Sequence, residues 1–184
     1  GDPVFVADAN GSDPRQIYVE EPGHHCHHLT WSPDGQFLYF VKGNPTSDEM
    51  DIWRIRVSGN SSPPRLERIT SHNARVGYPA WLDGRTLIYS APAENGSGES
   101  LYTVDVERRI PHRVSSGISE KYLSVAASAT SPRRIICTVA NPAVNLWTVP
   151  VSDRRQSESE VTRFPVKNAR ALAPRMASGY SLFL

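Results

Sequence analysis

A pattern of short strands that recurs every 45 to 49 residues most strongly constrains what this chain of 184 residues can fold into. The first part of the pattern is an Asp-Gly turn between two apolar runs, in Leu29–Phe40 and again in Pro79–Tyr89. Asp-Gly between such runs predicts a β-hairpin, because glycine accepts the positive φ that a tight turn requires. The second part is a short apolar strand, found in Pro3–Val6, Asp51–Ile55, Ser100–Val104 and Asn145–Val149.

The spacing of this second strand indicates one repeated structural unit. Val4, Ile52, Leu101 and Leu146 follow one another at intervals of 48, 49 and 45 residues. Each of the last three is followed by a polar turn and one more short strand, so the unit has four strands. A four-stranded unit that recurs about every 40 to 50 residues is typical of a β-propeller blade. We therefore predict an all-β fold, a β-propeller of four-stranded antiparallel blades.

The repeat register predicts about four blades in this chain, with one blade split between the N- and C-termini. The expected parts are an outer half-blade over 1–22, blades over 23–71, 72–117 and 118–166, and an inner half-blade over 167–184. The third hairpin is degenerate, since it lacks both Trp and Asp-Gly. Pairing the two terminal half-blades would close a four-bladed ring and cover its edge strands.

Two other closures stay open at this point. The chain is part of a larger ring of about six blades, or two copies exchange half-blades and form a homodimer with a ring of about eight blades. Pro is frequent, with 15 residues, and Gly contributes 12, which favours many short elements joined by turns over a helical bundle.

The charge balance excludes some classes of partner. The chain has 20 Lys and Arg against 19 Asp and Glu, a net charge of +1. Nucleic acid and anionic membranes require a concentrated basic surface, so we expect no nucleic-acid partner. No run approaches the roughly 20 apolar residues of a membrane-spanning helix, so we also expect no membrane insertion.

The run of histidines from His24 to His28, interrupted by Cys26, is the most conspicuous local cluster. In an extended strand alternate residues share a face, which would project His24, Cys26 and His28 together as candidate metal ligands. The alternative is a polar segment that leads into the innermost strand of a blade. No fourth ligand stands at a recognisable spacing, and we expect no cofactor.

Motifs for catalysis are missing from the sequence. It contains no Gly-x-Ser-x-Gly elbow, no His-Glu-x-x-His and no Gly-x-x-x-x-Gly-Lys, which are the local patterns of common hydrolases, zinc peptidases and nucleotide-binding loops. We therefore assign no catalytic residue and expect that the chain is not an enzyme.

The segment Trp31–Gly35, followed by Phe37–Phe40, resembles the repeat of TolB-type, WD40-like β-propellers. The resemblance continues through Asp48–Ile55, Arg68–Thr70 and Tyr102–Val114. It is similar to the propeller domains of bacterial multidomain kinases and winged-helix regulators, and it implies an interaction or sensing module without its own chemistry. It also favours an extracytoplasmic or periplasmic location.

These observations predict a noncatalytic scaffold that binds a protein or peptide, the sensory or interaction part of a larger bacterial system. Loops from all blades converge at the rim and channel mouth of a propeller, so we expect binding there. The repeat register places the candidate binding residues at one such mouth: His27, His28, Arg75, Tyr78 and Tyr122. Two alternatives remain, an accessory propeller of a prolyl-oligopeptidase-type peptidase and a metal-binding propeller.

Overall fold

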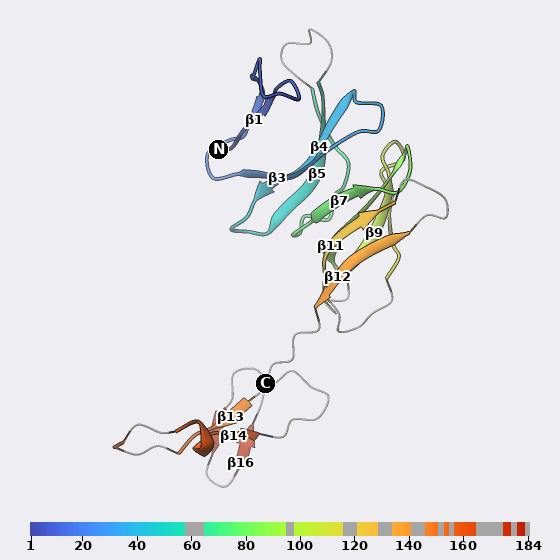
Figure 1. The fold of residues 1–184 in the computed structure, drawn as a ribbon. Helices are drawn as coiled ribbons and strands as arrows, with labels where there is room; N and C mark the ends of the chain where they lie inside the picture. Colours follow the sequence, from blue (N-terminus) through green and yellow to red (C-terminus); the bar gives the residue numbers. More distant parts are fainter. Residues whose placement is uncertain are drawn as a thin grey trace. The chain divides into compact units, whose positions relative to one another are not determined.

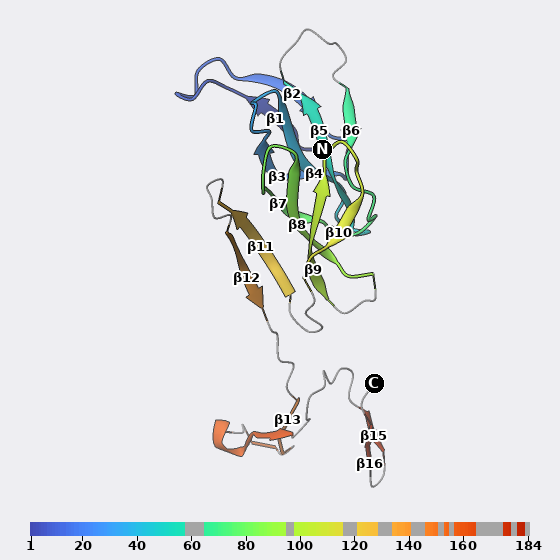
Figure 2. The same ribbon diagram turned by 90° about the vertical axis from the view of Figure 1, so that its right-hand side faces the viewer.

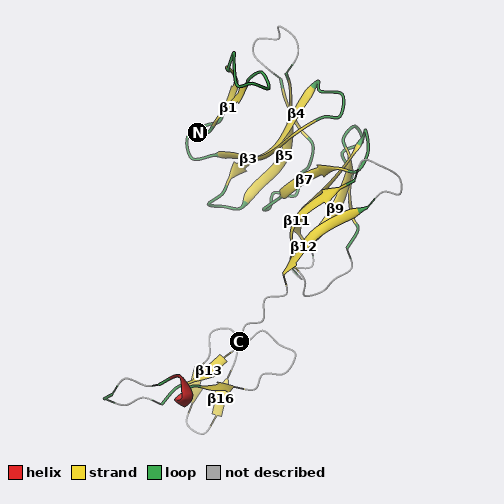
Figure 3. Ribbon diagram, in the orientation of Figure 1, coloured by secondary structure: helices red, strands yellow, loops and turns green. Residues whose placement is uncertain are grey.

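Short apolar runs separated by polar turns form sixteen short strands among the residues that the computed structural model of the chain describes. The structure describes residues 1–57, 65–94, 98–115, 121–128, 134–140, 146–150, 153–154, 157–164, 175–177 and 180–182. They belong to two compact units, Gly1–Asn141 and Pro142–Leu184 (Figure 1). Among these residues the helical element is one 3-10 turn, η1 (Glu158–Glu160), drawn red in Figure 3. None of the described helical structure is long and apolar enough to cross a membrane.

The first unit contains two complete four-stranded antiparallel sheets, flanked in the chain by two hairpins. The N-terminal hairpin is β1 (Pro3–Val6) and β2 (Arg15–Val19). The first full sheet comprises β3 (His25–Trp31), β4 (Phe37–Asn44), β5 (Glu49–Arg56) and β6 (Leu66–Arg68). The second comprises β7 (Gly77–Trp81), β8 (Thr86–Pro92), β9 (Glu99–Asp105) and β10 (Pro111–Arg113). The last hairpin is β11 (Lys121–Ala127) and β12 (Ile135–Ala140).

The second unit contains two two-stranded sheets. In it β13 (Leu146–Thr148) pairs with β14 (Thr162–Phe164), and β15 (Arg175–Ala177) pairs with β16 (Tyr180–Leu182), both antiparallel.

The Asp-Gly segments form the turns between β3 and β4 and between β7 and β8, as the sequence predicts. Gly35 has φ +68, and the Asp34 carboxylate accepts hydrogen bonds from the Ser32 hydroxyl (2.5 Å) and the Gln36 N–H (3.0 Å). These turns are longer than a two-residue hairpin, and in each the aspartate side chain accepts hydrogen bonds from backbone N–H groups of the loop.

The third strands of the two full sheets donate equivalent hydrogen bonds, as expected for a repeated unit. The N–H of Ile52 donates to the hydroxyl of Thr70 at 2.9 Å, and the N–H of Leu101 donates to the hydroxyl of Ser115 at 2.9 Å. In each sheet this bond fixes the segment that follows the fourth strand against the third.

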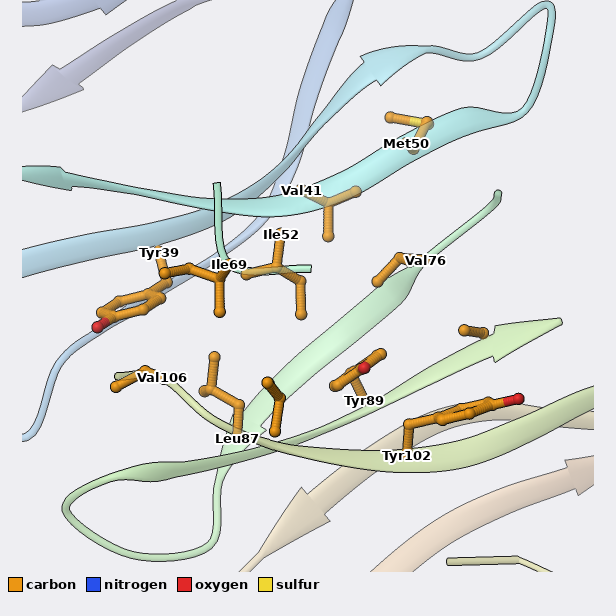
Figure 4. Close-up of a cluster of buried hydrophobic side chains, with 12 residues drawn as sticks. Tyr39, Val41, Met50, Ile52, Ile69, Val76, Leu87, Tyr89, Tyr102 and Val106 are labelled. Carbon is orange, nitrogen blue, oxygen red and sulfur yellow. The ribbon is translucent and has the colours of Figure 1, made fainter. Parts of the chain in front are cut away.

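The core lies between sheets that pack face to face. Along β4, Leu38 and Phe40 point to one face and pack with Val4 of β1, whereas Tyr39 and Val41 point to the other. This alternation follows from the pleat of a strand, and it buries both faces of the sheet. The second face meets β8 and β9 in a cluster shown in Figure 4: Tyr39, Val41, Met50, Ile52, Ile69, Val76, Leu87, Tyr89, Ala91, Tyr102, Val104 and Val106.

Ion pairs also join successive sheets. Arg54 of β5, which is 8% exposed, bonds Glu67 of its own sheet (3.0 Å) and Glu107 after β9 (2.7 Å). Lys42 of β4 bonds Glu20, which follows β2, at 2.9 Å. Because Glu20 and Arg54 are buried, each pair ties neighbouring sheets together at a defined position.

Four-stranded antiparallel sheets that follow one another along the chain and pack face to face are the blades of a β-propeller (Figures 1 and 2). The sheets β3–β6 and β7–β10 lie within the expected blades 23–71 and 72–117. The expected blade 118–166 contains two separate hairpins, β11–β12 and β13–β14, which belong to different units. The expected half-blades 1–22 and 167–184 belong to different units, so their pairing stays a prediction.

Candidate binding site at the first strands of three sheets

A cavity of about 340 Å³ opens where β7 lies between β3 and β11, the first strands of three successive sheets. It lies toward the N-terminal end of β3, and the Asp-Gly turn follows the other end of that strand. The cavity is lined by His27, His28, Met50, Arg75, Val76, Gly77, Tyr78, Ser90, Glu99, Lys121 and Leu123.

Each of the three first strands carries a β-bulge at this cavity. The pairing shifts between His27 and Thr30 in β3, between Gly77 and Ala80 in β7, and between Tyr122 and Ser124 in β11. In each case the first strand has one residue more than its partner. A bulge re-aims a side chain and often occurs next to a functional site.

The residues at two of these bulges have a strained backbone. His28 and Tyr78 both have φ +55, in the left-handed region that residues other than glycine seldom adopt. They stand at equivalent repeat positions, three residues before Trp31 and Trp81. Such conformations cost about 1 to 3 kcal/mol and persist where the surrounding structure enforces them, frequently at functional sites.

The strained residues meet across the two sheets. The rings of His28 and Tyr78 are in contact, with centroids 4.1 Å apart and planes tilted by 45°. A Cβ added to Gly77 would lie 3.8 Å from Nε2 of His28 and 3.4 Å from Oγ of Ser90, which places both side chains in van der Waals range of the Gly77 backbone. His27 lies beside this pair, and its Nε2 is 3.4 Å from Sδ of Met50.

Arg75 reaches the cavity on the segment between β6 and β7. A parallel β-bridge joins its backbone to that of Met50. The preceding residues are held by the buried carboxylate of Asp51, which accepts hydrogen bonds from the N–H groups of His72 (2.9 Å) and Asn73 (3.1 Å). A side chain buried in the sheet thus positions the exposed Arg75.

The cavity contains neutral imidazoles and unpaired charges. Burial lowers the pKa of both His27 and His28, and the neighbouring imidazoles and the Arg75 charge lower it further. Both rings are therefore uncharged near neutral pH. Within the part of the chain that the structure describes, the side chains of Arg75, Lys121 and Glu99 have no hydrogen bond or ion pair.

Four of the five predicted binding residues come together here: His27, His28, Arg75 and Tyr78. Tyr122 is not among the lining residues, while its neighbours Lys121 and Leu123 are. Successive residues of a strand point to opposite faces, which accounts for this difference of one position. Whether these residues bind a ligand stays a prediction.

Sequence reasoning missed the other lining residues: Met50, Val76, Gly77, Ser90, Glu99, Lys121 and Leu123. The repeat itself carried a signal for two of them, because Met50 and Glu99 are 49 residues apart, the same interval as Ile52 and Leu101.

The structure does not bring His24, Cys26 and His28 together as a ligand set. Cys26 lies 3.7 Å from the Glu20 carboxylate at Sγ, whereas the bulge aims His28 into the cavity. Burial, reinforced by the Glu20 charge, raises the pKa of the Cys26 thiol to about 12, which disfavours the thiolate that a metal needs. Across the described ranges no group of three or more His, Cys, Asp or Glu side chains could hold a metal ion.

A second cavity, of about 660 Å³, lies between the two full sheets at the Asp-Gly turns. It is lined by Ser32, Pro33, Asp34, Phe37, Tyr39, Arg54, Trp81, Gly84, Arg85, Val106 and Glu107. Its cations are already paired: Arg54 with Glu107, and Arg85 with Asp105 at 2.9 Å. The smaller cavity is therefore the better candidate for a charged or polar ligand.

The sheets that carry this cavity define a β-propeller fold, and solved TolB-like propeller proteins share this fold. The structure is similar to TolB from Acinetobacter baumannii, with a TM-score of 0.51 and 16% identity, over 96% of this chain and 41% of that one. It is also similar to a puromycin-hydrolyzing peptidase from Mycobacterium tuberculosis, with a TM-score of 0.56 and 14% identity, over 89% of this chain and 25% of that one. The chain thus spans less than half the length of either protein, and no family model matches it.

Proposed function

We propose that this chain is a noncatalytic binding module, and that a protein or peptide partner binds at the cavity lined by β3, β7 and β11. The observation that carries this proposal is the repeated bulge. Three successive first strands each insert one extra residue at one cavity, and two of these residues, His28 and Tyr78, have the backbone strain that accompanies functional sites. The blades hold these side chains on strands, which position them more rigidly than loops do.

The hydrogen bonds in the cavity support contact rather than chemistry. The hydroxyl of Ser90 donates to the carbonyl of Gly77 at 3.2 Å, so its proton is directed to the backbone and not to an imidazole. A serine nucleophile needs a base within hydrogen-bond reach. We propose that the module serves as the sensory or interaction part of a larger bacterial system.

The test is selection of peptides from a displayed random library on the immobilised chain, followed by titration of the selected peptides into the ¹⁵N-labelled protein. We expect chemical shift changes at the residues that line the cavity. Tyr78→Ala should weaken binding at least tenfold, because it removes the ring that contacts His28. Tyr122→Ala is the matched control, since this tyrosine lies beside the cavity without lining it. Selected peptides that bind elsewhere, or that bind both variants equally, would refute the proposal.

The alternative of an accessory propeller of a peptidase is favoured by one observation, the fold similarity to the puromycin-hydrolyzing peptidase. The coding sequence around this segment distinguishes the two. An adjoining α/β-hydrolase domain would favour the peptidase, and an adjoining kinase or winged-helix domain would favour the sensor.

A further inference from the structure

The charged side chains of the cavity point to one class of ligand group. Resting on the function proposed above, we propose that the cavity recognises a carboxylate of a peptide partner, and that Arg75 and Lys121 bind this group. The lining contains these two cations and the single anion Glu99, which leaves a net positive charge of one.

The lack of internal partners for the two cations supports this proposal. Other cations near the sheets pair with acidic side chains, such as Lys42 with Glu20 at 2.9 Å and Arg54 with Glu107 at 2.7 Å. Arg75 and Lys121 line a cavity without such an ion pair among the described residues. A guanidinium presents a planar fork of N–H donors that matches the two oxygens of a carboxylate.

The remaining lining residues fit the rest of such a ligand. The side chain of Leu123 supplies apolar surface for an aliphatic stem, and Met50 also lines the cavity. Met50 is buried, and Leu123 is 38% exposed. The neutral imidazoles of His27 and His28 each offer one N–H donor without adding charge. The pocket therefore suits a carboxylate on an apolar stem, which is the chemistry of an acidic side chain and of a chain terminus.

Two sources can supply this group, the side chain of Asp or Glu and the C-terminal carboxylate. Four peptides separate them: acetyl-Ala-Leu-Glu-Leu-Ala-amide, the same peptide with Gln, and acetyl-Ala-Leu-Ala-Leu-Ala as free acid and as amide. We expect saturable chemical shift changes at the cavity residues with at least one peptide that bears a carboxylate. The neutral counterpart of that peptide should bind at least tenfold more weakly.

Variants test which side chains bind the carboxylate. Arg75→Gln and Lys121→Gln should each weaken binding of the carboxylate peptide about tenfold, a typical loss for one charge-assisted contact. Glu99→Gln should strengthen it two- to threefold, because this change removes the anion that repels the ligand. Misfolding cannot produce such a gain. Arg108→Gln, which removes an exposed arginine outside the cavity, is the matched control.

The outcomes separate this inference from the proposed function. If peptides from the library bind at the cavity but neither carry nor need a carboxylate, the module binds peptides and the carboxylate inference is wrong. Equal binding of charged and neutral peptides, or unchanged binding by Arg75→Gln and Lys121→Gln, would also overturn it. If no peptide shifts the resonances of the cavity, both proposals fail.

Discussion

Replacement of Asp51 tests how the blade holds the segment that carries Arg75. The side chain of Asp51 is 3% exposed, and it accepts four hydrogen bonds. The donors are Arg68 Nη2 (2.5 Å), the Thr70 hydroxyl (2.6 Å), and the N–H groups of His72 (2.9 Å) and Asn73 (3.1 Å). This carboxylate thus joins β5 to the connection between the two full sheets.

The expected loss of unfolding free energy depends on whether each donor can bond to water once the Asp51 carboxylate is removed. Removing one partner of a buried ion pair costs about 3 to 5 kcal/mol. The side chain of Arg68 is 38% exposed and can form hydrogen bonds to water instead. The buried hydroxyl of Thr70 cannot easily do so. We therefore expect Asp51→Ala to lower the free energy of unfolding by about 3 kcal/mol. Asp51→Asn keeps the shape and one acceptor oxygen, and should cost about 1.5 kcal/mol.

Urea unfolding followed by tryptophan fluorescence and circular dichroism measures these losses. Asp13→Asn is the matched control, because it removes the same charge from an exposed turn residue whose positive φ of 51° asparagine tolerates. It should change the free energy of unfolding by less than about 0.5 kcal/mol. A loss below about 1 kcal/mol for Asp51→Ala would refute the reasoning, since water would then replace the carboxylate at all four donors.

Three further predictions concern the segment around β2 and β3. Burial raises the pKa of Glu20, but hydrogen bonds from Lys42, the backbone and a tyrosine outweigh it, so the net pKa lies below its unfolded value of 4.5. The ion pair of Glu20 with Lys42 should therefore stabilise the fold above pH 4.5 and lose this effect as the pH falls through the lower folded pKa. Thermal melts from pH 7 to pH 3 should show this loss, and Glu20→Gln should remove the dependence. Iodoacetamide at pH 8 should alkylate Cys26 more slowly in the folded chain than in urea, as peptide mass spectrometry would reveal. Zinc should leave the melting temperature unchanged, and a rise that requires His24, Cys26 and His28 together would contradict the observed placement.

The repeated unit could be predicted from sequence because its signals are local and recur. Asp34 and Gly35 mark a turn whatever lies elsewhere in the chain, and the same pair recurs at Asp83 and Gly84. The interval of 49 residues between Ile52 and Leu101 then relates two sheets that make equivalent hydrogen bonds from these residues. The turn signal depends on neighbouring residues only, and together with the repeat interval it predicts the order of strands within each sheet.

The candidate site could be predicted only in part, because it depends on where strict alternation fails. Alternation groups Cys26 with His28, but the extra residue in β3 turns His28 toward the cavity while Cys26 stays against Glu20. No periodicity indicates the position of an inserted residue. The partners of the bulge residues also come from other sheets, as in the contact of His28 with Tyr78, and such pairs are not adjacent in the sequence.

The energetics of the ring at the β7 bulge bear on the binding role proposed for this cavity. Glycine would adopt the left-handed backbone of Tyr78 without strain, whereas tyrosine incurs a cost of about 1 to 3 kcal/mol. The contact of its ring with His28 stabilises the fold by about 0.5 to 1.5 kcal/mol, so it offsets this cost at most in part. Fold stability therefore gives little reason to prefer a ring at this position. Tyr78 remains 42% exposed at the cavity, where the ring presents a surface and a hydroxyl that glycine cannot supply. The buried strands β4, β5, β8 and β9 supply the stability, which leaves the bulged strands free to present exposed side chains at the cavity.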